Sequence, residues 1–350
     1  MGHLAKSMAA ALAAALVSAG AVLVGTASLA KAAEIEWSLQ TVAGAGTTEY
    51  KQLVERFADY VDQLTGGRVA IKTFPAGMLM KSSEVAGAVS KGTLEMGHTF
   101  LVYYSGKEPA LKAVNEWPAM VQPLQGVMWF YEGGGAEIMR EITAKHDMHF
   151  LGVSPLLGEH IWAKKPLNGV EDLKGIKIRA SALAADSFAR LGASVVSLSG
   201  EEVYQALQRG VVDATEFTTM PVNYGFGFHE IAKYVMLPSY SGGGTSDWIV
   251  NMKAWNELPD VLKPKMEQAL RLVSYDYYRQ SRLEEEDVKD KLHSAGVKMI
   301  TWSETDMRKL ERARIDVMRE KYAAESPLFA KKLDSQLKFL ERLGYENATR

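Results

Sequence analysis

The chain has 350 residues, no cysteine and a formal net charge of −2 at pH 7. This small charge argues against a nucleic-acid-binding protein, because the neutralisation of phosphates needs a clear excess of Lys and Arg. The lack of cysteine excludes disulfide bonds, thiolate metal sites and cysteine nucleophiles. A chain of this length can bury a core that is stable without cross-links, and the length favours two domains over one.

The first 32 residues have the pattern of a secretory signal peptide. Lys6 precedes the apolar run Met8–Val24, and Ala30–Ala32 fits a small-residue cleavage site. A membrane anchor is the alternative, but Gly20 and Gly25 interrupt the apolar run. Cleavage would remove two lysines and no acid, and would leave 318 residues with a net charge of −4. No later stretch has the roughly 20 apolar residues of a membrane span, so we expect a periplasmic protein whose mature chain does not cross the membrane.

The predicted elements begin with a strand, a helix and a second strand. Alternating apolar and polar residues predict a strand over Glu34–Thr41, and apolar residues three and four apart predict a helix over Thr48–Leu64. Val69–Phe74 is the second strand, and this βαβ order favours a mainly parallel sheet. The intervening glycine loop has neither G-x-G-x-x-G nor a Walker pattern, so we do not expect a nucleotide site.

An aromatic pair follows the third predicted strand. Leu94–Tyr104 is predicted as this strand and leads into a loop that contains Tyr103 and Tyr104. Tyrosine suits the wall of a ligand site, because its ring buries area while its hydroxyl can be hydrogen-bonded. Two half-buried core aromatics are an equal alternative.

The middle of the chain contains a strand that we expect to cross between two domains. This stretch, Phe150–Lys164, alternates irregularly through Pro155 and Gly158 and contains Glu159 and His160. A lone buried histidine is more often structural than a ligand.

Arg179 stands at the end of a predicted short strand. Apolar and charged residues alternate over Ile176–Arg179, and Ser181 is placed to cap a helix over Ala182–Leu191. Ligands of open α/β sheets bind beyond the carboxyl ends of the strands. The guanidinium group is a planar, permanently charged fork that matches a carboxylate. A surface ion pair is the alternative on spacing alone.

A second strand, Val211–Phe217, ends in Thr215, Glu216 and Phe217. If this strand is parallel to the one that carries Arg179, both ends lie on one edge of the sheet. A carboxylate beside an arginine can form a buried salt bridge, accept a ligand hydroxyl or help to hold a cation.

The C-terminal third begins with a glycine-rich segment, Tyr240–Thr245, which suits a hinge, a close approach of the backbone to a ligand, or a plain loop. Ser246–Val250 is the next predicted strand. A long helix over Leu262–Ala295 and two further helices follow, and we expect the acidic run Glu284–Asp287 on a solvated helix face.

Three stretches resemble the tripartite ATP-independent periplasmic (TRAP) transporter solute-binding proteins of the DctP type. They are DLKGIKIR at 172–179, QALQRGVVDATE at 205–216 and VNMKAWNELP at 250–259. The order of the elements agrees over essentially the whole mature chain. The resemblance implies an α/β, two-domain periplasmic binding protein fold with hinge strands and a long C-terminal helix.

The resemblance also implies domain boundaries. Residues 33–153 and about 240–270 would form domain I, and residues 154–239 would form domain II. Residues 271–350 would form a helical C-terminal segment that spans or braces both domains.

The function that the resemblance implies is the capture of a small organic acid, with a 2-oxo or 2-hydroxy monocarboxylate favoured. The acid would be delivered to TRAP membrane permease subunits that an ion gradient drives. A dicarboxylate, sugar acid or sulfonate is the alternative ligand, and a sensory component is the alternative role. The chain has no G-x-S-x-G elbow, H-E-x-x-H motif or cysteine nucleophile, so we do not expect an enzyme.

In this family the arginine that matches Arg179 pairs with the ligand carboxylate. In the 2-oxo and 2-hydroxy acid branch, the matching acid and the next residue's backbone hold a metal ion, which makes Glu216 and Phe217 candidate ligands of calcium or sodium. Phe217 replaces the usual tryptophan, and Ser241 stands near the place of the usual glutamine or glutamate, so a metal-free site is the alternative. The predicted substrate-binding residues are Arg179, Glu159, Glu216, Phe217, Tyr103, Tyr104 and Ser241.

Overall fold

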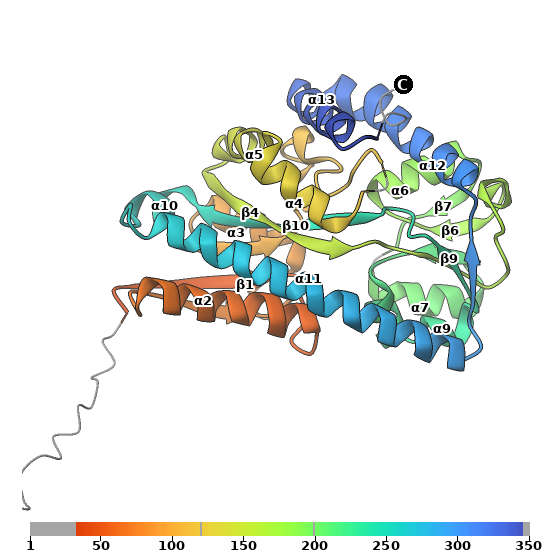
Figure 1. The fold of residues 1–350 in the computed structure, drawn as a ribbon, viewed down its shortest axis with the longest axis horizontal. Helices are drawn as coiled ribbons and strands as arrows, with labels where there is room; N and C mark the ends of the chain where they lie inside the picture. Colours follow the sequence, from red (N-terminus) through yellow and green to blue (C-terminus); the bar gives the residue numbers. More distant parts are fainter. Residues whose placement is uncertain (1–32, 120, 199, 346–350) are drawn as a thin grey trace, which may run out of the picture. The chain divides into compact units, whose positions relative to one another are not determined.

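The computed structural model describes residues 33–119, 121–198 and 200–345. The predicted signal peptide, residues 1–32, lies outside the described residues. The chain divides into two units, Met1–Ala33 and Glu34–Arg350. The fold described below is that of the second unit (Figure 1).

The first sheet has five strands in the order β2-β1-β3-β10-β4. Their bounds are β1 Ile35–Thr41, β2 Val69–Phe74, β3 Met96–Thr99, β4 Met148–Leu157 and β10 Gly243–Asn251. Strand β1 pairs in parallel with β2 and β3, as the βαβ order predicts. Strand β10 is antiparallel to both β3 and β4, so the sheet is mixed.

The third strand is shorter than predicted. It ends at Thr99, and Leu101–Tyr104 forms a 3₁₀ turn instead. The backbone N–H of Leu101 donates to the buried carboxyl group of Asp247 at 2.8 Å. A side chain therefore takes the place of the ladder partner there, and the backbone leaves the sheet.

The second sheet has six strands in the order β11-β9-β5-β8-β6-β7. Their bounds are β5 Ile161–Ala163, β6 Lys177–Arg179, β7 Ser194–Val196, β8 Ala214–Glu216, β9 Tyr234–Leu237 and β11 Lys298–Thr301. Strands β6 and β8 are parallel, with Arg179 paired to Thr215. The ends of these two strands therefore lie on one edge of the sheet.

Two short segments, which we call the crossovers, join the two sheets. Residues 158–160 connect β4 to β5, and residues 238–242 connect β9 to β10. The crossovers are hydrogen-bonded to each other: the backbone N–H of Tyr240 donates to the carbonyl oxygen of Glu159 at 2.9 Å. Strand β4 runs on through Pro155, and the change of sheet comes after it, at Gly158.

The second half of the predicted glycine-rich loop belongs to a strand. Gly243 and Gly244 belong to β10 and pair with Leu157 and Leu156. A Cβ atom at Gly243 would meet the ring of Pro123 at 2.6 Å. Glycine is needed there for close packing of the backbone rather than for a hinge.

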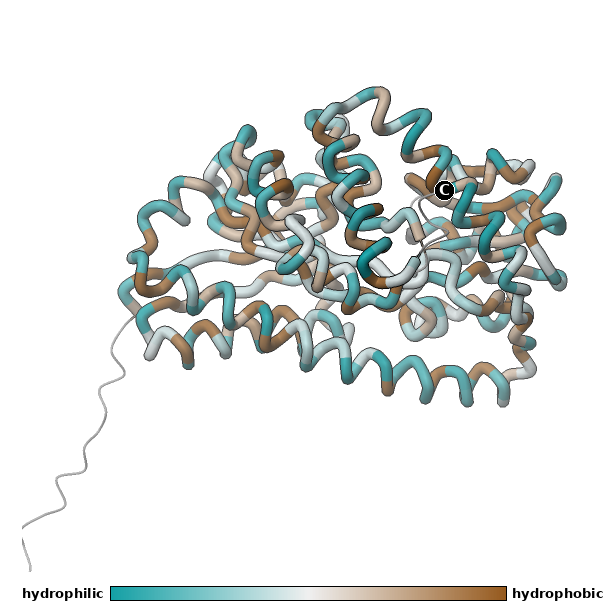
Figure 2. The backbone as a smooth tube through the Cα atoms, turned by 45° about the horizontal axis from the view of Figure 1, so that its top comes forward, coloured by the Kyte–Doolittle hydropathy of each residue, from teal (hydrophilic) through white to brown (hydrophobic). Residues whose placement is uncertain are grey.

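The α-helices surround the sheets (Figure 1). Their bounds are α2 Arg56–Thr65, α3 Val85–Ser90, α4 Pro123–Glu132, α5 Gly135–Ala144, α6 Ala182–Arg190, α7 Gly200–Arg209, α8 Met220–Gly225, α9 Phe228–Ile231, α10 Met252–Glu257, α11 Lys263–Ser294, α12 Glu304–Val317 and α13 Pro327–Arg342. A π-helical turn, Tyr50–Glu55, precedes α2 and completes the predicted first helix. Apolar and polar residues alternate along the helices, which gives each an apolar side for packing (Figure 2).

The long helix α11 contributes to two hydrophobic clusters. It has 32 residues and passes beside α2 (Figure 1). Leu270 and Val273 pack in a cluster with residues of the first sheet, whereas Val288 and Leu292 pack with Trp162 of the second sheet. One straight element therefore touches the cores of both sheets.

The prediction of a fully solvated acidic face on α11 is wrong for Glu285. This side chain is only 5% exposed. Its Oε1 atom lies 3.8 Å from Nε2 of His160, and Arg282 and Lys289 of the same helix pair with it.

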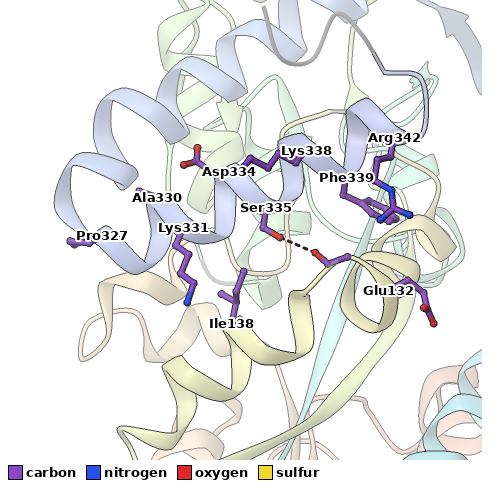
Figure 3. A pocket seen from close by; sticks show the side chains of 11 residues that line it. Glu132, Ile138, Pro327, Ala330, Lys331, Asp334, Ser335, Lys338, Phe339 and Arg342 are labelled. Atoms are coloured by element: carbon purple, nitrogen blue, oxygen red, sulfur yellow. Dashed lines mark hydrogen bonds between the residues drawn. The ribbon is translucent and has the colours of Figure 1, made fainter.

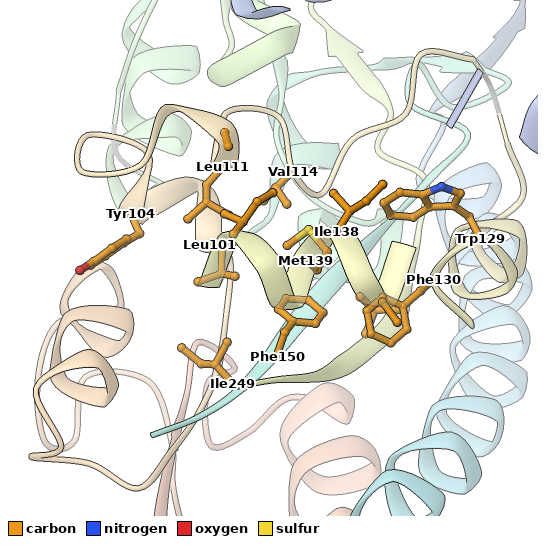
Figure 4. Packing of buried hydrophobic residues seen from close by; sticks show 14 of the residues in the cluster. Leu101, Tyr104, Leu111, Val114, Trp129, Phe130, Ile138, Met139, Phe150 and Ile249 are labelled. Carbon is orange, nitrogen blue, oxygen red and sulfur yellow. The ribbon is translucent and has the colours of Figure 1, made fainter. Parts of the chain in front are cut away.

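A further hydrophobic cluster lies between the first sheet and α4, α5 and α13. The rings of Phe130 and Phe150 lie next to each other (Figure 4), with their centroids 5.3 Å apart and their planes tilted by 46°. Burial of each such side chain contributes about 1.5–3 kcal/mol to stability. Among the described residues, no helix is both long and apolar enough to cross a membrane.

We expect Gly158, at the first crossover, not to tolerate a side chain. A Cβ atom there would meet Oγ of Ser239 at 2.0 Å and the carbonyl oxygen of Gly242 at 2.4 Å. Gly158→Ala should lower the free energy of unfolding by about 1–3 kcal/mol, because a backbone carbonyl cannot rotate out of the way. Urea unfolding followed by circular dichroism measures this change.

Gly87 in α3 is the matched control, because nothing lies within 4 Å of a Cβ atom at that position. Gly87→Ala should leave stability unchanged or increase it, since alanine favours a helix. Equal unfolding midpoints for the two variants would contradict the packing argument.

Candidate functional site

Arg179, the last residue of β6, is held in one orientation inside the protein. Its side chain is 6% exposed. Nε and Nη2 donate to the carbonyl oxygen of Leu198 at 3.2 and 3.0 Å, and Nη1 donates to the main-chain oxygen of Glu216 at 2.9 Å. The guanidinium group also lies over the ring of Phe217, 5.1 Å from its centroid, which is a favourable cation–π distance.

These bonds use three of the five N–H donors of the guanidinium group. One N–H of each terminal nitrogen has no hydrogen-bond acceptor among the described residues. Two such donors on adjacent nitrogens can hold a carboxylate in a bidentate pair. Arg179 is therefore oriented by backbone carbonyls in a way that leaves a fork for an anion.

Glu159 and Glu216 come together beside this arginine. The hydroxyl group of Tyr240 lies 2.8 Å from Oε2 of Glu159 and 3.2 Å from Oε1 of Glu216. The second oxygen of Glu216 lies 3.8 Å from Nη1 of Arg179. The cluster thus combines the ends of β6 and β8 with both crossovers.

The two carboxyl groups have raised pKa values. Burial is the largest cause for both, and the proximity of Glu159 raises the pKa of Glu216 further. The positive charge of Arg179 opposes the rise but does not cancel it. Both carboxyl groups therefore keep a proton to higher pH than an exposed glutamate does, and the rise is larger for Glu216. Burial also raises the pKa of Tyr240, so that its hydroxyl group stays a donor.

The start of α6 is also part of this arrangement. Ser181 occupies the predicted cap position, but its side chain makes no capping hydrogen bond. Its backbone N–H donates to Oε2 of Glu216 at 3.3 Å instead. The next residue, Ala182, has a φ angle of +48°, a conformation that is uncommon for alanine and typical of functional sites.

Two further predicted residues lie next to the cluster. Ser241 is buried, and its Oγ accepts a hydrogen bond from the backbone N–H of Glu159 at 3.0 Å, so it links the crossovers. Phe217 packs against Phe226 and Phe228 as well as under Arg179. Its ring therefore forms an apolar support for the guanidinium group.

The structure does not bring Tyr103 and Tyr104 to Arg179. Tyr103 is 51% exposed, and Tyr104 is buried with its ring edge-on to His146. Both line a separate hollow of about 520 Å³ together with Lys91 and Lys107. The early end of β3 turns this segment away from the direction that a longer strand would have given it.

Another hollow also lies away from Arg179. It has a volume of about 660 Å³ and runs along α13, where Lys331 points toward Ile138 of α5 (Figure 3). Ser335 crosses one end of it and donates to the carbonyl oxygen of Gly133 at 3.0 Å. None of its lining residues belongs to the Arg179 cluster.

Sequence reasoning missed Tyr240, Arg314 and Glu116. Tyr240 is the first residue of the glycine-rich segment Tyr240–Thr245, whose composition points to backbone freedom and gives no sign of a role for this side chain. Arg314 carried a usable signal, because it continues the three- and four-residue spacing of Met307 and Leu310 and so falls on the buried face of its helix. Glu116 lies outside any regular element and carried no signal.

The raised pKa values predict that stability falls as pH rises. Free glutamate titrates near 4.5, whereas the folded pair keeps its proton to higher pH. The free energy of unfolding should therefore decrease from about pH 4.5 up to the folded pKa values. Glu216→Gln keeps the shape but removes one titrating group, so its decline should be flatter when urea unfolding is measured from pH 5 to pH 8 in the presence of a chelator.

Glu55→Gln is the control, because Glu55 is exposed. It should keep the pH dependence of the wild type. Equal slopes for wild type and Glu216→Gln would show that Glu216 does not hold the proton.

Comparisons with known proteins agree on a single family. The profile of the bacterial extracellular solute-binding proteins, family 7 (DctP), matches residues 39–325. The monocarboxylate 2-oxoacid-binding periplasmic protein of Nostoc sp. is 32% identical over 268 residues, which are 76% of this chain and 74% of that protein.

Solved structures show the same fold. A TRAP periplasmic solute-binding protein from Pseudoalteromonas atlantica, with bound sodium and pyruvate, is 28% identical with a TM-score of 0.78 and covers 89% of this chain and 95% of that chain. One from Colwellia psychrerythraea, with bound calcium and pyruvate, is 26% identical with the same TM-score and coverage. The predicted α/β binding-protein fold is confirmed. The chain therefore belongs to the DctP family, family 7 of the bacterial extracellular solute-binding proteins.

Proposed function

We propose that this protein is a periplasmic TRAP solute-binding protein that captures a small organic acid, favouring a 2-oxo or 2-hydroxy monocarboxylate. It hands the acid unchanged to TRAP membrane permease subunits. The observation that carries this proposal is the state of Arg179. Its side chain is buried and held by backbone carbonyls, and one N–H on each terminal nitrogen has no acceptor among the described residues. The relatives named above bind monocarboxylate 2-oxoacids or pyruvate, which supports the same ligand class here.

The charges around Arg179 favour a ligand with one carboxylate. Three carboxyl groups, those of Glu116, Glu159 and Glu216, influence one another at this place. A second ligand carboxylate would lie close to these three carboxyl groups, and the burial of like charges together is strongly unfavourable. A dicarboxylate is therefore the weaker candidate.

A hard cation bound with the ligand would fit this site. Glu159 and Glu216 offer carboxyl oxygens, the donors that calcium and sodium prefer, and burial, which raises the pKa of both groups, makes a nearby positive charge favourable for their ionised forms. Among the described residues, no group of three or more His, Asp or Glu side chains could hold a metal ion. The backbone carbonyl of Phe217 and oxygens of the ligand would complete the coordination. The cation would supply the charge that lets both carboxyl groups ionise.

The two sheets form the cores of two domains in this proposal. The sequence predicts residues 33–153 and about 240–270 for domain I, 154–239 for domain II and 271–350 as a brace; strand β4 continues the first sheet to Leu157. The crossovers act as the hinge. Since Glu159 and Tyr240 lie on the crossovers, a bound ligand touches the hinge itself, and closure follows from binding. Export is part of the proposal, with cleavage of the signal peptide after Ala32.

Removal of the guanidinium fork should abolish tight binding. Arg179→Lys keeps the charge but loses the planar pair of donors, so the affinity for sodium pyruvate should fall by about 30-fold or more in calorimetry, as for a broken buried charge pair. Arg190→Lys is the control, because Arg190 is an exposed arginine on α6 that pairs with Glu320. Unchanged affinity in Arg179→Lys would refute the role of Arg179.

If the wild type does not bind pyruvate, a thermal-shift screen of oxo, hydroxy, dicarboxylic, sugar and sulfonic acids identifies the ligand. A ligand at 100 times its dissociation constant stabilises by about 2.7 kcal/mol. No stabilisation by any acid would contradict the proposed ligand class.

The cation makes a separate prediction. Dialysis against a chelator into a sodium-free buffer should weaken acid binding, and added calcium or sodium should restore it. Glu216→Gln should lose this dependence, because it lacks the carboxylate that holds the ion. If chelated wild type binds the acid with unchanged affinity, no cation takes part.

A further inference from the structure

Arg314 lies on α12, behind the proposed site, and is completely buried. Its Nη2 atom donates to the carbonyl oxygen of Trp117 at 2.7 Å, and Nη1 donates to the carbonyl oxygen of Tyr240 at 3.3 Å. The guanidinium carbon also lies over the Tyr240 ring, 5.4 Å from its centroid. The arginine therefore contacts both the backbone and the side chain of Tyr240.

These contacts determine where the hydroxyl group of Tyr240 points. The backbone N–H of this residue is bonded to Glu159, its carbonyl oxygen to Arg314, and its ring also meets Phe188 with centroids 5.5 Å apart. A tyrosine side chain has two rotatable angles, and a fixed backbone and ring plane leave little freedom. The hydroxyl group is thereby held against both Glu159 and Glu216.

Glu116 connects Arg314 to the strand end that carries Arg179. Its Oε2 atom lies 3.6 Å from Nη2 of Arg314, and Oε1 accepts a hydrogen bond from the backbone N–H of Leu183 at 3.3 Å. Leu183 is in the first turn of α6, which begins shortly after Arg179. Arg314 thus has indirect contact with both halves of the site.

Stability alone is a poor explanation for this buried pair. Nε of Arg314 and Oε2 of Glu116 have no hydrogen-bond partner among the described residues. Apolar side chains of similar volume often stabilise a core as well as a buried ion pair or better. The contacts that the arginine does make are directed at Tyr240 and at the segment that contains Glu116.

We infer that Arg314 is a positioning residue of the binding site, which holds Tyr240 so that its hydroxyl group bridges Glu159 and Glu216. This inference rests on the proposed function, because it takes the two carboxyl groups as part of the ligand site. In this role Arg314 acts on the site through its contacts with Tyr240.

A double-mutant cycle with Tyr240→Phe and Arg314→Met tests the inference. Each single variant should weaken the binding of sodium pyruvate about tenfold, the size expected for coupled residues in one network. If Arg314 acts through the hydroxyl group, the double variant should bind about as tightly as the weaker single variant. Independent effects that multiply would overturn the inference.

Two further variants separate positioning from general stability. Arg314→Lys keeps a charge over the ring and one hydrogen bond, so it should recover part of the affinity. Arg308→Met removes an exposed arginine from the same helix and should bind like the wild type. If neither Arg314→Met nor Arg314→Lys folds, Arg314 is a structural residue and the inference fails.

The test also works if the proposed ligand is wrong. The coupling between the two positions is then measured as the shift in urea midpoint for the same four proteins. Absence of pyruvate binding by the wild type counts against the proposed function alone, whereas additive midpoint shifts count against the positioning role.

Discussion

The burial of two carboxyl groups beside one arginine is the constraint on which the site depends. Like charges this close, and this poorly solvated, cannot both ionise without a compensating charge. Arg179 supplies part of it, and the raised pKa values of both carboxyl groups favour the retention of a proton. In the free protein the two carboxyl groups therefore repel each other. Binding of an anion at Arg179 together with a cation at the carboxyl groups would remove this repulsion. The hydrogen bonds that orient the guanidinium group go to backbone carbonyl oxygens, while the carboxyl group of Glu216 lies 3.8 Å from Nη1.

The topology explains why these groups meet. Parallel strands β6 and β8 bring Arg179 and Glu216 to one edge, and the two crossovers bring Glu159 and Tyr240 to the same place. A glycine at position 158 is what allows the crossovers to approach so closely. The charged groups of the site therefore lie where the chain passes from one sheet to the other.

The sequence predicted the parts of this site that local pattern determines. Arg179 and Glu216 each end a strand, and both lie in motifs that resemble a known family. The strand before Tyr103 and Tyr104 is shorter than its apolar pattern predicts, because the carboxyl group of Asp247 accepts a hydrogen bond from the backbone N–H of Leu101. The sequence does not predict the roles of Tyr240 and Glu116, because these roles come from contacts between segments that are distant in the chain. The burial of Arg314 could be predicted, since this arginine occupies a position in its helix where the spacing calls for an apolar residue.

The continuous helix α11 has a mechanical consequence. A helix of 32 residues is about 48 Å long, and α11 is packed into hydrophobic clusters of both sheets. Any opening at the crossovers must bend this rod or slide one cluster along it. Because bending a helix costs free energy, α11 would oppose a large separation of the two sheets and favour their return to the arrangement in which the helix is unbent.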